Sequence, residues 1–472
     1  MNPALWLLAP LAFLVLVGPG RRHNAITLVA AATVEVIVAT VIAIGGVDTG
    51  ADDLLTTDAT ARLFLLVIDW AFVGVVVYAW NRARVDATRP EASARRGYLG
   101  IVFLVAMNVV VVANHMLLAW LALEVTSLAA APQIAQASLP GSRGASWRYL
   151  VFSIVGLGLA SLGFWCLGHG GADGAHASMR FDVLAHTPAP ADDPWRDLGF
   201  ALLVLGLGTK LGLAPMYSWL PETYDEAPAA ITAMLAAVQF NGTLVLLVRV
   251  LQIPGARAGV AGDALLVLGL ASMAVSAGSI LATRNVKRLV AYASINHAGV
   301  IAIGLGLGGE AAYGVLLYAV SNAFIKAILF LSIGHIEQHY QTKQMRDVGG
   351  LIKDLPYTGL FLMVGTFALL GFPPFGSFLG ELLILSALAA SGQMLVFAGF
   401  CAVIATTFIA TGRSVFPMIW GESRIKATWH RQRLLPHLPK LVLLIALVMM
   451  GLYLPTSVNT LFREVAASMG SR

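Results

Sequence analysis

Five ionisable residues lie inside apolar runs that are each long enough to cross a lipid bilayer. They are Glu124, Lys210, His297, Lys326 and Glu381, and each stands near the middle of its run. A charge near the bilayer centre costs at least ~2.5–3.5 kcal/mol on insertion scales, so such residues mark ion or proton pathways by default. A buried carboxylate or ammonium loses its charge unless a neighbour of opposite sign stabilises it. A lysine whose carboxylate partner can move away is therefore a proton carrier, and the five residues predict proton transfer within the membrane.

A static interpretation competes with this one. Glu124–Lys210 and Lys326–Glu381 are candidates for fixed ion pairs that hold helices together, although buried pairs contribute little to stability. His297 fits a packing role as well as a relay role. Two further residues are candidates for supporting roles. Tyr292 could hold water beside His297, and Arg413, near the end of its run, either snorkels to the interface or takes part in function.

Prolines interrupt two of the apolar runs. Pro215 follows Lys210 by five residues, and the pair Pro373 and Pro374 precedes Glu381. A proline removes a backbone donor and kinks a helix, and the freed carbonyls are tolerated at membrane depth only where protein or water satisfies them. A broken membrane helix beside a buried charge therefore favours a transport element over a passive anchor.

The composition defines the class of protein. Of the 472 residues, 58% are hydrophobic and 12% are charged, against about 25% charged in ordinary globular domains. Mean hydropathy is +0.80. The long apolar runs predict an all-α integral membrane protein, whereas a β-barrel would show short alternating segments. Cys166 and Cys401 both fall inside apolar runs, so neither a disulfide framework nor a metal site is expected. No Gly-rich phosphate loop, CxxC pair or HExxH helix appears, and we expect no redox cofactor site in this chain. The basic residues are explained by membrane topology, and no nucleic-acid partner is expected.

Runs of 17–25 apolar residues predict about fourteen transmembrane helices. They centre on residues 3–19, 25–46, 61–80, 98–113, 115–134, 149–168, 198–219, 229–251, 262–282, 289–308, 311–334, 357–390, 393–419 and 438–456. Twenty of the thirty Lys and Arg residues fall in loops after odd-numbered spans, in clusters such as Arg82 to Arg96 and Arg424 to Lys440. The positive-inside rule then predicts a multi-pass protein of the cytoplasmic (inner) membrane with both termini outside.

The broken helices occupy matching places in two blocks of five spans. We expect an N-terminal three-helix segment (1–97), a first repeat (98–251), a second repeat (252–419), and a basic loop with the last span (420–472). An odd number of helices inverts the second copy across the membrane. Interrupted helices at corresponding positions are typical of inverted-repeat transporters whose site lies near the midplane.

Four stretches carry a resemblance to a known family. KLGLAPMYSWLPETYDEAP, NVKRLVAYASINHAG, SNAFIKAILFLSIGH and FPPFGSFLGELLIL resemble, in order, the antiporter-like membrane subunits of respiratory complex I, membrane-bound hydrogenases and multisubunit cation/proton antiporters. The resemblance covers roughly residues 95–430. It implies a fourteen-helix fold with two inverted five-helix repeats, proton movement along a hydrated mid-membrane axis, and a lysine–glutamate partnership between Lys210 and Glu124.

The chain departs from the family pattern at two positions. Asn241 stands where many members carry lysine or histidine, and Asn322 stands where histidine is common. Asparagine cannot carry a proton as a cation, so water must bridge there. The first departure looks more like the hydrogenase and formate-hydrogenlyase branch. An inert scaffold whose relay has lapsed is a third alternative, supported mainly by these two asparagines.

The leading hypothesis is a proton-translocating subunit of a larger redox-driven complex, with no redox site in this chain. Its expected partners are the lipid bilayer, other membrane subunits, further antiporter-like subunits and soluble redox subunits. The alternative is a cation/proton antiporter, or an ion-driven uptake module for a solute such as bicarbonate, without redox partners. The sequence leaves open which complex, which ion and which driving reaction are involved.

Overall fold

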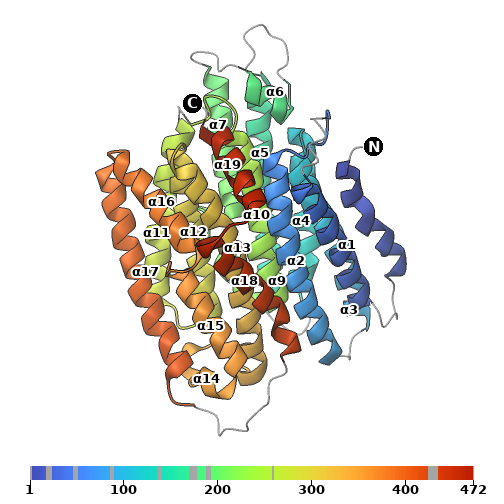
Figure 1. Cartoon of the computed structure of the whole chain (residues 1–472), viewed down its shortest axis with the longest axis vertical. Coiled ribbons are helices and arrows are strands. Elements are labelled where there is room, and N and C mark those ends of the chain that lie inside the picture. The colour runs from blue at the N-terminus through green and yellow to red at the C-terminus, as the bar shows by residue number, and fades with distance from the viewer. Residues whose placement is uncertain are drawn as a thin grey trace.

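A computed structural model describes residues 3–17, 24–45, 52–85, 90–136, 141–169, 178–187, 193–257, 260–423 and 434–470. The described chain is a bundle of long helices that run along one axis (Figure 1). Its only β-type pairings among these residues are isolated bridges at the helix ends. The predicted all-α membrane fold is confirmed.

The helices follow one another with short connections. In the N-terminal part they are η1 (Pro3–Leu16), α1 (Asn24–Ile44), α2 (Ala59–Val85), α3 (Pro90–Val112), α4 (Met116–Ile134), α5 (Ser142–His169) and α6 (Phe181–His186). In the middle they are α7 (Pro194–Leu211), α8 (Trp219–Glu226), α9 (Ala229–Ala233), the π-helix η2 (Met234–Gln239), α10 (Phe240–Leu251), α11 (Val260–Ala282), α12 (Val286–Leu307) and α13 (Ala311–Tyr340). The last are η3 (Met345–Asp347), α14 (Leu351–Asp354), α15 (Pro356–Leu369), α16 (Gly376–Ala390), α17 (Met394–Trp420), η4 (Leu435–His437), α18 (Leu438–Leu452) and α19 (Thr456–Gly470).

The described helices agree with the predicted count of fourteen crossings. Eleven are long and apolar enough to span a membrane, with α9, η2 and α10 forming one of them. The shorter apolar helix η1 and the two broken helices, α7–α8 and α15–α16, complete the set. The chain is therefore a multi-pass integral membrane protein.

Both predicted breaks are present. Helix α7 ends at Leu211, and Gly212 adopts a left-handed conformation with φ of +81°. Helix α15 ends at Leu369, and Gly371 has φ of +68°. Glycine suits this conformation because it has no Cβ. Pro215, Pro373 and Pro374 lie in the links that follow and are exposed.

Helices α10 and α13 form the centre of the bundle. Every residue of α10 is buried, and so is the apolar stretch of α13. Helix α5 packs along α7, and α13 packs along α16, so each broken helix lies against a long one. This order is consistent with the two predicted blocks, and the inverted symmetry between them stays a prediction.

The two ends of the bundle differ in charge. We call the end that carries α14 and the connections after α11 and α13 the basic end, and the end that carries α6 the acidic end (Figure 1). At the basic end, the carboxylate of Asp225 contacts Arg288 at 2.7 Å and Lys343 at 3.0 Å. These ion pairs attach the end of the first broken helix to the start of α12 and to the connection after α13.

Two features of the last part differ from the expectation. Lys440, which we expected in a basic loop, lies inside α18 and is fully buried. Its ammonium lies 3.2 Å from His335 Nδ1 and over the ring of Phe361. The unpredicted helix α19 packs on α2 and α13.

Candidate functional site

The first part of the site is built where α7 crosses α5. A Cβ on Gly206 would lie 2.5 Å from the carbonyl oxygen of Gly156, and one on Gly163 would lie 2.8 Å from that of Gly199. Small residues let two membrane helices approach this closely. The approach places Ser153, one turn before Gly156, next to Lys210 in the last turn of α7.

Lys210 is held by neutral groups. Its ammonium donates to Ser127 Oγ at 2.5 Å and to Ser153 Oγ at 3.3 Å, and it lies 5.5 Å from the ring centre of Tyr149. Only 5% of the residue is exposed. In the described part of the chain, no carboxylate lies within ion-pair distance of this lysine. We call Ser127, Ser153 and Tyr149 the lysine cradle.

Glu124 lies one helical turn before Ser127 on α4 and is half-buried. Its carboxylate interacts electrostatically with Lys210, but the direct ion pair that we considered is not formed. One carboxylate oxygen, Oε2, is buried without a hydrogen-bond partner. Glu124 and Lys210 are therefore neighbours, but the ammonium bonds to the serines of the lysine cradle and not to the carboxylate.

The second part of the site lies between α12, α13 and α16. Lys326 on α13 is fully buried, and its single polar contact in the described part of the chain is the carbonyl oxygen of Val290 at 3.4 Å. His297 on α12 stacks on Tyr318 with ring centres 5.2 Å apart and interacts electrostatically with Lys326. The structure thus brings Lys326 and His297 together.

Glu381 folds back towards the break in its helix. A Cβ on Gly371 would lie 2.9 Å from Glu381 Oε2, and the carboxylate is close enough to Tyr318 for the two groups to interact electrostatically. Glu381 does not pair with Lys326, so the second static ion pair is also not formed among the described residues. Tyr318 instead stands between His297 and Glu381.

The supporting residues have different surroundings. Asn241 and Asn322 are buried, and in the described part of the chain neither amide oxygen has a hydrogen-bond partner. Tyr292 is half-buried near Arg288. Arg413 is exposed on α17, so it does not face the buried residues. Of these four residues, Asn322 lies beside the row, because it interacts with His297.

The connection between the two halves was missed in the sequence. Gln239, in the π-helix η2, donates to Tyr149 Oη at 2.6 Å and lies 3.5 Å from Thr126. A chain of ring contacts also leads from Tyr149 through Trp219 and Tyr224 to Phe330, one turn beyond Lys326 on α13. The polar residues in an otherwise apolar run, QFNG at 239–242, were the available signal.

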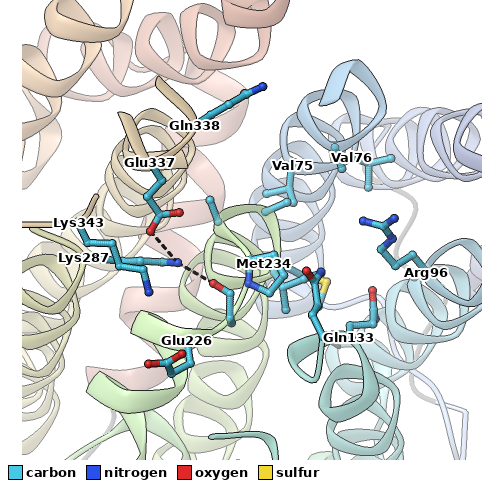
Figure 2. A pocket seen from close by; sticks show the side chains of 18 of the residues that line it. Val75, Val76, Arg96, Gln133, Glu226, Met234, Lys287, Glu337, Gln338 and Lys343 are labelled. Atoms are coloured by element: carbon cyan, nitrogen blue, oxygen red, sulfur yellow. Dashed lines mark hydrogen bonds and ion pairs between the residues drawn. The ribbon is translucent and has the colours of Figure 1, made fainter. Parts of the chain in front are cut away.

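A cavity of about 750 Å³ opens at the basic end, beside the first broken helix. Figure 2 shows Lys287 and Glu337 on one side of this cavity and Arg96 on the other. Lys287 contacts Glu337 at 3.2 Å and the carbonyl oxygen of Ala227 at 2.6 Å. We call this cavity the vestibule.

Comparison with known proteins decides the family. The sequence profile described as "NADH:quinone oxidoreductase/Mrp antiporter, TM" matches residues 113–408, more than half of the chain. The chain belongs to this family. Its sequence is 31% identical over 371 residues to a Hydrogenase-4 component F homolog of Methylacidiphilum infernorum, covering 76% of each chain. It is 32% identical over 305 residues to NADH-quinone oxidoreductase subunit N of Desulforudis audaxviator, covering 63% of this chain and 58% of that one.

Solved structures share the fold of this antiporter-like subunit. A chain of an archaeal membrane-bound sulfane sulfur reductase matches with a TM-score of 0.87 and 21% identity, covering 99% of this chain and 98% of that one. A chain of the Mrp complex from Dietzia matches with a TM-score of 0.84 and 18% identity, over 99% and 96%. A chain of respiratory complex I from Thermus thermophilus matches with 0.76 and 20%, over 95% and 96%. The antiporter-like membrane-subunit fold expected from the four sequence stretches is confirmed, and the inverted symmetry of its repeats stays a prediction.

Proposed function

We propose that this antiporter-like subunit moves protons along a buried row within a larger membrane complex. The row runs from Glu124 and Lys210 through His297 and Lys326 to Glu381. The observation that carries the proposal is the burial of two lysines, Lys210 and Lys326, with only neutral contacts among the described residues. Burial disfavours the charged form of a lysine, so each ammonium can release its proton within the membrane.

The acids at the two ends of the row supply the other half of the chemistry. Glu124 interacts electrostatically with Lys210, yet it makes no direct contact with it among the described residues. A carboxylate that moves closer loads the lysine, and one that moves away unloads it. Glu381, on the second broken helix, would exchange with an aqueous side or the next subunit.

The passage between the halves is the most demanding step. Asn241 and Asn322 cannot carry a proton as a cation, and aromatic rings occupy part of the route from Tyr149 to Phe330. Water that hydrogen-bonds to Gln239 and to the free amide oxygens would bridge this step. A scaffold with a lapsed relay would show no transport at all.

The proposed setting follows the relatives. They are named as subunits of a hydrogenase and of NADH-quinone oxidoreductase, which supports a redox-driven complex with soluble redox subunits and other membrane subunits as partners. The basic loops support an inner-membrane location with that end in the cytoplasm. The family description also names Mrp antiporters, which supports a second candidate, a cation/proton antiporter without redox partners. Subunits that co-purify with the tagged chain decide between these two candidates.

Proton transport by two single-substitution variants tests the proposal. The tagged chain is isolated with its native partners, reconstituted into liposomes, and given a potassium-diffusion potential while a pH-sensitive dye reports proton entry. Lys210→Ala and Glu124→Ala should abolish proton flux while the partners still co-purify. Lys353→Ala, at an exposed lysine of the basic end, is the control and should keep the wild-type flux. Normal flux in both test variants would contradict the proposal.

A further inference from the structure

A second group of buried ionisable residues lies outside the proposed row, in the N-terminal three helices. Glu35 on α1 and Asp69 on α2 are 0% and 1% exposed, and both contact Asn108 on α3, which is 0% exposed. The amide nitrogen of Asn108 donates to Glu35 Oε1 at 2.5 Å and to Asp69 Oδ1 at 3.1 Å. We call these three residues the carboxylate cluster.

Three oxygen atoms of this cluster have no hydrogen-bond partner among the residues that the structure describes. They are Glu35 Oε2, Asp69 Oδ2 and the amide oxygen of Asn108. Buried polar atoms are normally satisfied, and an uncompensated buried carboxylate is far costlier than an unpaired amide. Two carboxylates and an amide oxygen are thus left with unused acceptors at fully buried positions.

No basic side chain neutralises the cluster in the described part of the chain. The only charged group that acts on Glu35 is Asp69, which is also acidic. Charged side chains on these helices and on those packed against them have partners of their own: Arg62 contacts Glu464, Arg95 the carbonyls of Pro132 and Ala135, Arg249 Asp58, Glu337 Lys287, Lys326 the carbonyl of Val290, and Lys440 His335. Glu124 interacts electrostatically with Lys210. The cluster therefore needs a positive charge from elsewhere.

The same three helices lead from the cluster to the vestibule. Leu28, Phe72 and Gly100 line the vestibule on α1, α2 and α3. Glu35 lies seven residues beyond Leu28, Asp69 three residues from Phe72, and Asn108 eight residues beyond Gly100, so each lies on the same helix face as its lining residue. At about 1.5 Å per residue, these offsets are roughly 5–12 Å towards the acidic end.

An aromatic pair separates the vestibule from the cluster. The rings of Phe72 and Phe103 stack with centres 6.2 Å apart and planes inclined by 15°. Both residues are buried, and each lies between a vestibule residue and a cluster residue along its helix. Side-chain rotation of these rings would open a short path from the basic end.

From this geometry we infer that Glu35, Asp69 and Asn108 form a binding site for one monovalent cation, a proton or Na⁺, that exchanges with the vestibule. One proton shared by the carboxyls would satisfy both orphan carboxylate oxygens. A sodium ion would take the same oxygens, which suit a hard cation. A divalent ion such as Ca²⁺ needs six to eight oxygen ligands, more than the cluster offers.

Infrared difference spectroscopy of the purified complex tests the site without relying on transport. Spectra are recorded between acidic and alkaline buffer, and at constant pH on replacing choline chloride with sodium chloride. The wild type should show a band of protonated buried carboxyl that disappears at high pH and is absent from the Glu35→Gln/Asp69→Asn double variant. Disappearance of this band on adding Na⁺ at constant pH identifies Na⁺ as a ligand, and an unchanged band identifies the proton alone.

Identical difference spectra for the wild type and the double variant would overturn the inference. If the double variant does not assemble, the isosteric single variants Glu35→Gln and Asp69→Asn decide: a weaker band in either supports the site, and an unchanged band in both refutes it. Glu464→Gln, at an exposed carboxylate on α19, should leave the band unchanged. Because binding is measured directly, the result stands whether or not the buried row transports protons.

Discussion

Lys210 shows how a buried ammonium is held when its carboxylate neighbour stays out of contact. Two serine hydroxyls accept hydrogen bonds from the ammonium, and the ring of Tyr149 lies beside it. Hydroxyl groups stabilise an ammonium less than a carboxylate does, because they carry no net charge. The lysine cradle therefore orients the side chain and leaves its protonation state sensitive to where Glu124 stands.

Ser127→Ala should weaken proton transport by removing the shorter of these two hydrogen bonds. A hydrogen bond to a charged group contributes about 1.5–3 kcal/mol, so we expect roughly a tenfold or larger drop in flux. Proton entry into liposomes is the measurement. Ser161→Ala removes a hydroxyl on α5 that bonds only to the carbonyl of Gly158, and its flux should match the wild type.

Lys326→Arg should keep the fold and the positive charge yet lose most of the transport. Arginine cannot readily release its proton inside a protein. Lys440→Arg is a matched control, because Lys440 is equally buried but lies outside the row. Near-normal flux in Lys326→Arg, measured alongside that control, would show that Lys326 is a fixed electrostatic post.

At the scale of the elements, the broken helices are anchored by glycine. Helix α7 meets α5 through Gly156 and Gly206, and α16 meets α13 through Gly314 and Gly380. A Cβ on Gly380 would lie 2.7 Å from the backbone nitrogen of Tyr318, so this contact also fixes the tyrosine between His297 and Glu381. The half-helices with their breaks are thus held against unbroken neighbours.

Gly206→Ala should destabilise the protein, because its new methyl group would lie 2.5 Å from the carbonyl oxygen of Gly156. Overpacking of this kind costs about 1–3 kcal/mol, and we expect a lower unfolding temperature of the purified complex. Gly158→Ala is the control on α5, since nothing lies within 4 Å of its added Cβ. Equal unfolding temperatures for both variants would show that the helices adjust freely.

The sequence predicted the breaks but not what surrounds them. Prolines and buried charges in apolar runs are rare enough to be read directly, and Glu35 and Asp69 carried the same signal as Glu124. Ser127, Ser153 and Tyr318 could not be singled out, because serine and tyrosine are ordinary residues of membrane helices. Their role depends on which helices touch, and the glycine contacts that decide this are invisible in a single apolar run.

At the scale of the molecule, the acidic end is closed by interactions around Asp182. Its carboxylate accepts from Arg180 at 2.7 Å and from Asn114 at 2.8 Å, which connects α6 to the start of α4. The hydrogen bond from Arg180 lowers the pKa of Asp182, although partial burial opposes it. A carboxyl with a depressed pKa adds stability above its ordinary pKa, near 3.9, and that stability is lost as pH falls through the lowered value.

Acid unfolding tests this connection. The unfolding temperature of the wild type should fall as pH drops below about 4, and Asp182→Asn should be less stable at neutral pH and show a smaller fall. Asp347→Asn, at a carboxylate that is 46% exposed and pairs with Arg346, serves as the control and should follow the wild-type curve. Parallel curves of unfolding temperature against pH for all three proteins would show that Asp182 does not contribute to acid unfolding.

The arrangement of the whole molecule was predicted in outline. Apolar length and the distribution of Lys and Arg predicted the fourteen crossings, but they misplaced Lys440, which lies near a loop in the sequence and inside α18 in space. The two fixed ion pairs of the static interpretation are not formed among the described residues, for a related reason. Sequence gives the depth of a charge along its helix, whereas pairing depends on how each helix is rotated about its own axis.

The glycine contacts between helices also bear on how fast different parts of the protein can move. Helices in backbone contact move as one body, and collective motions of that kind take microseconds to milliseconds. A lysine side chain, with four rotatable bonds, changes rotamer far faster. Since α7 is held to α5 and α16 to α13, the proposed function needs only side-chain motion of Lys210 and Glu381, while these helices stay in place. In that case the rate of transport would be limited by the arrival of protons at these side chains and not by movement of the helices.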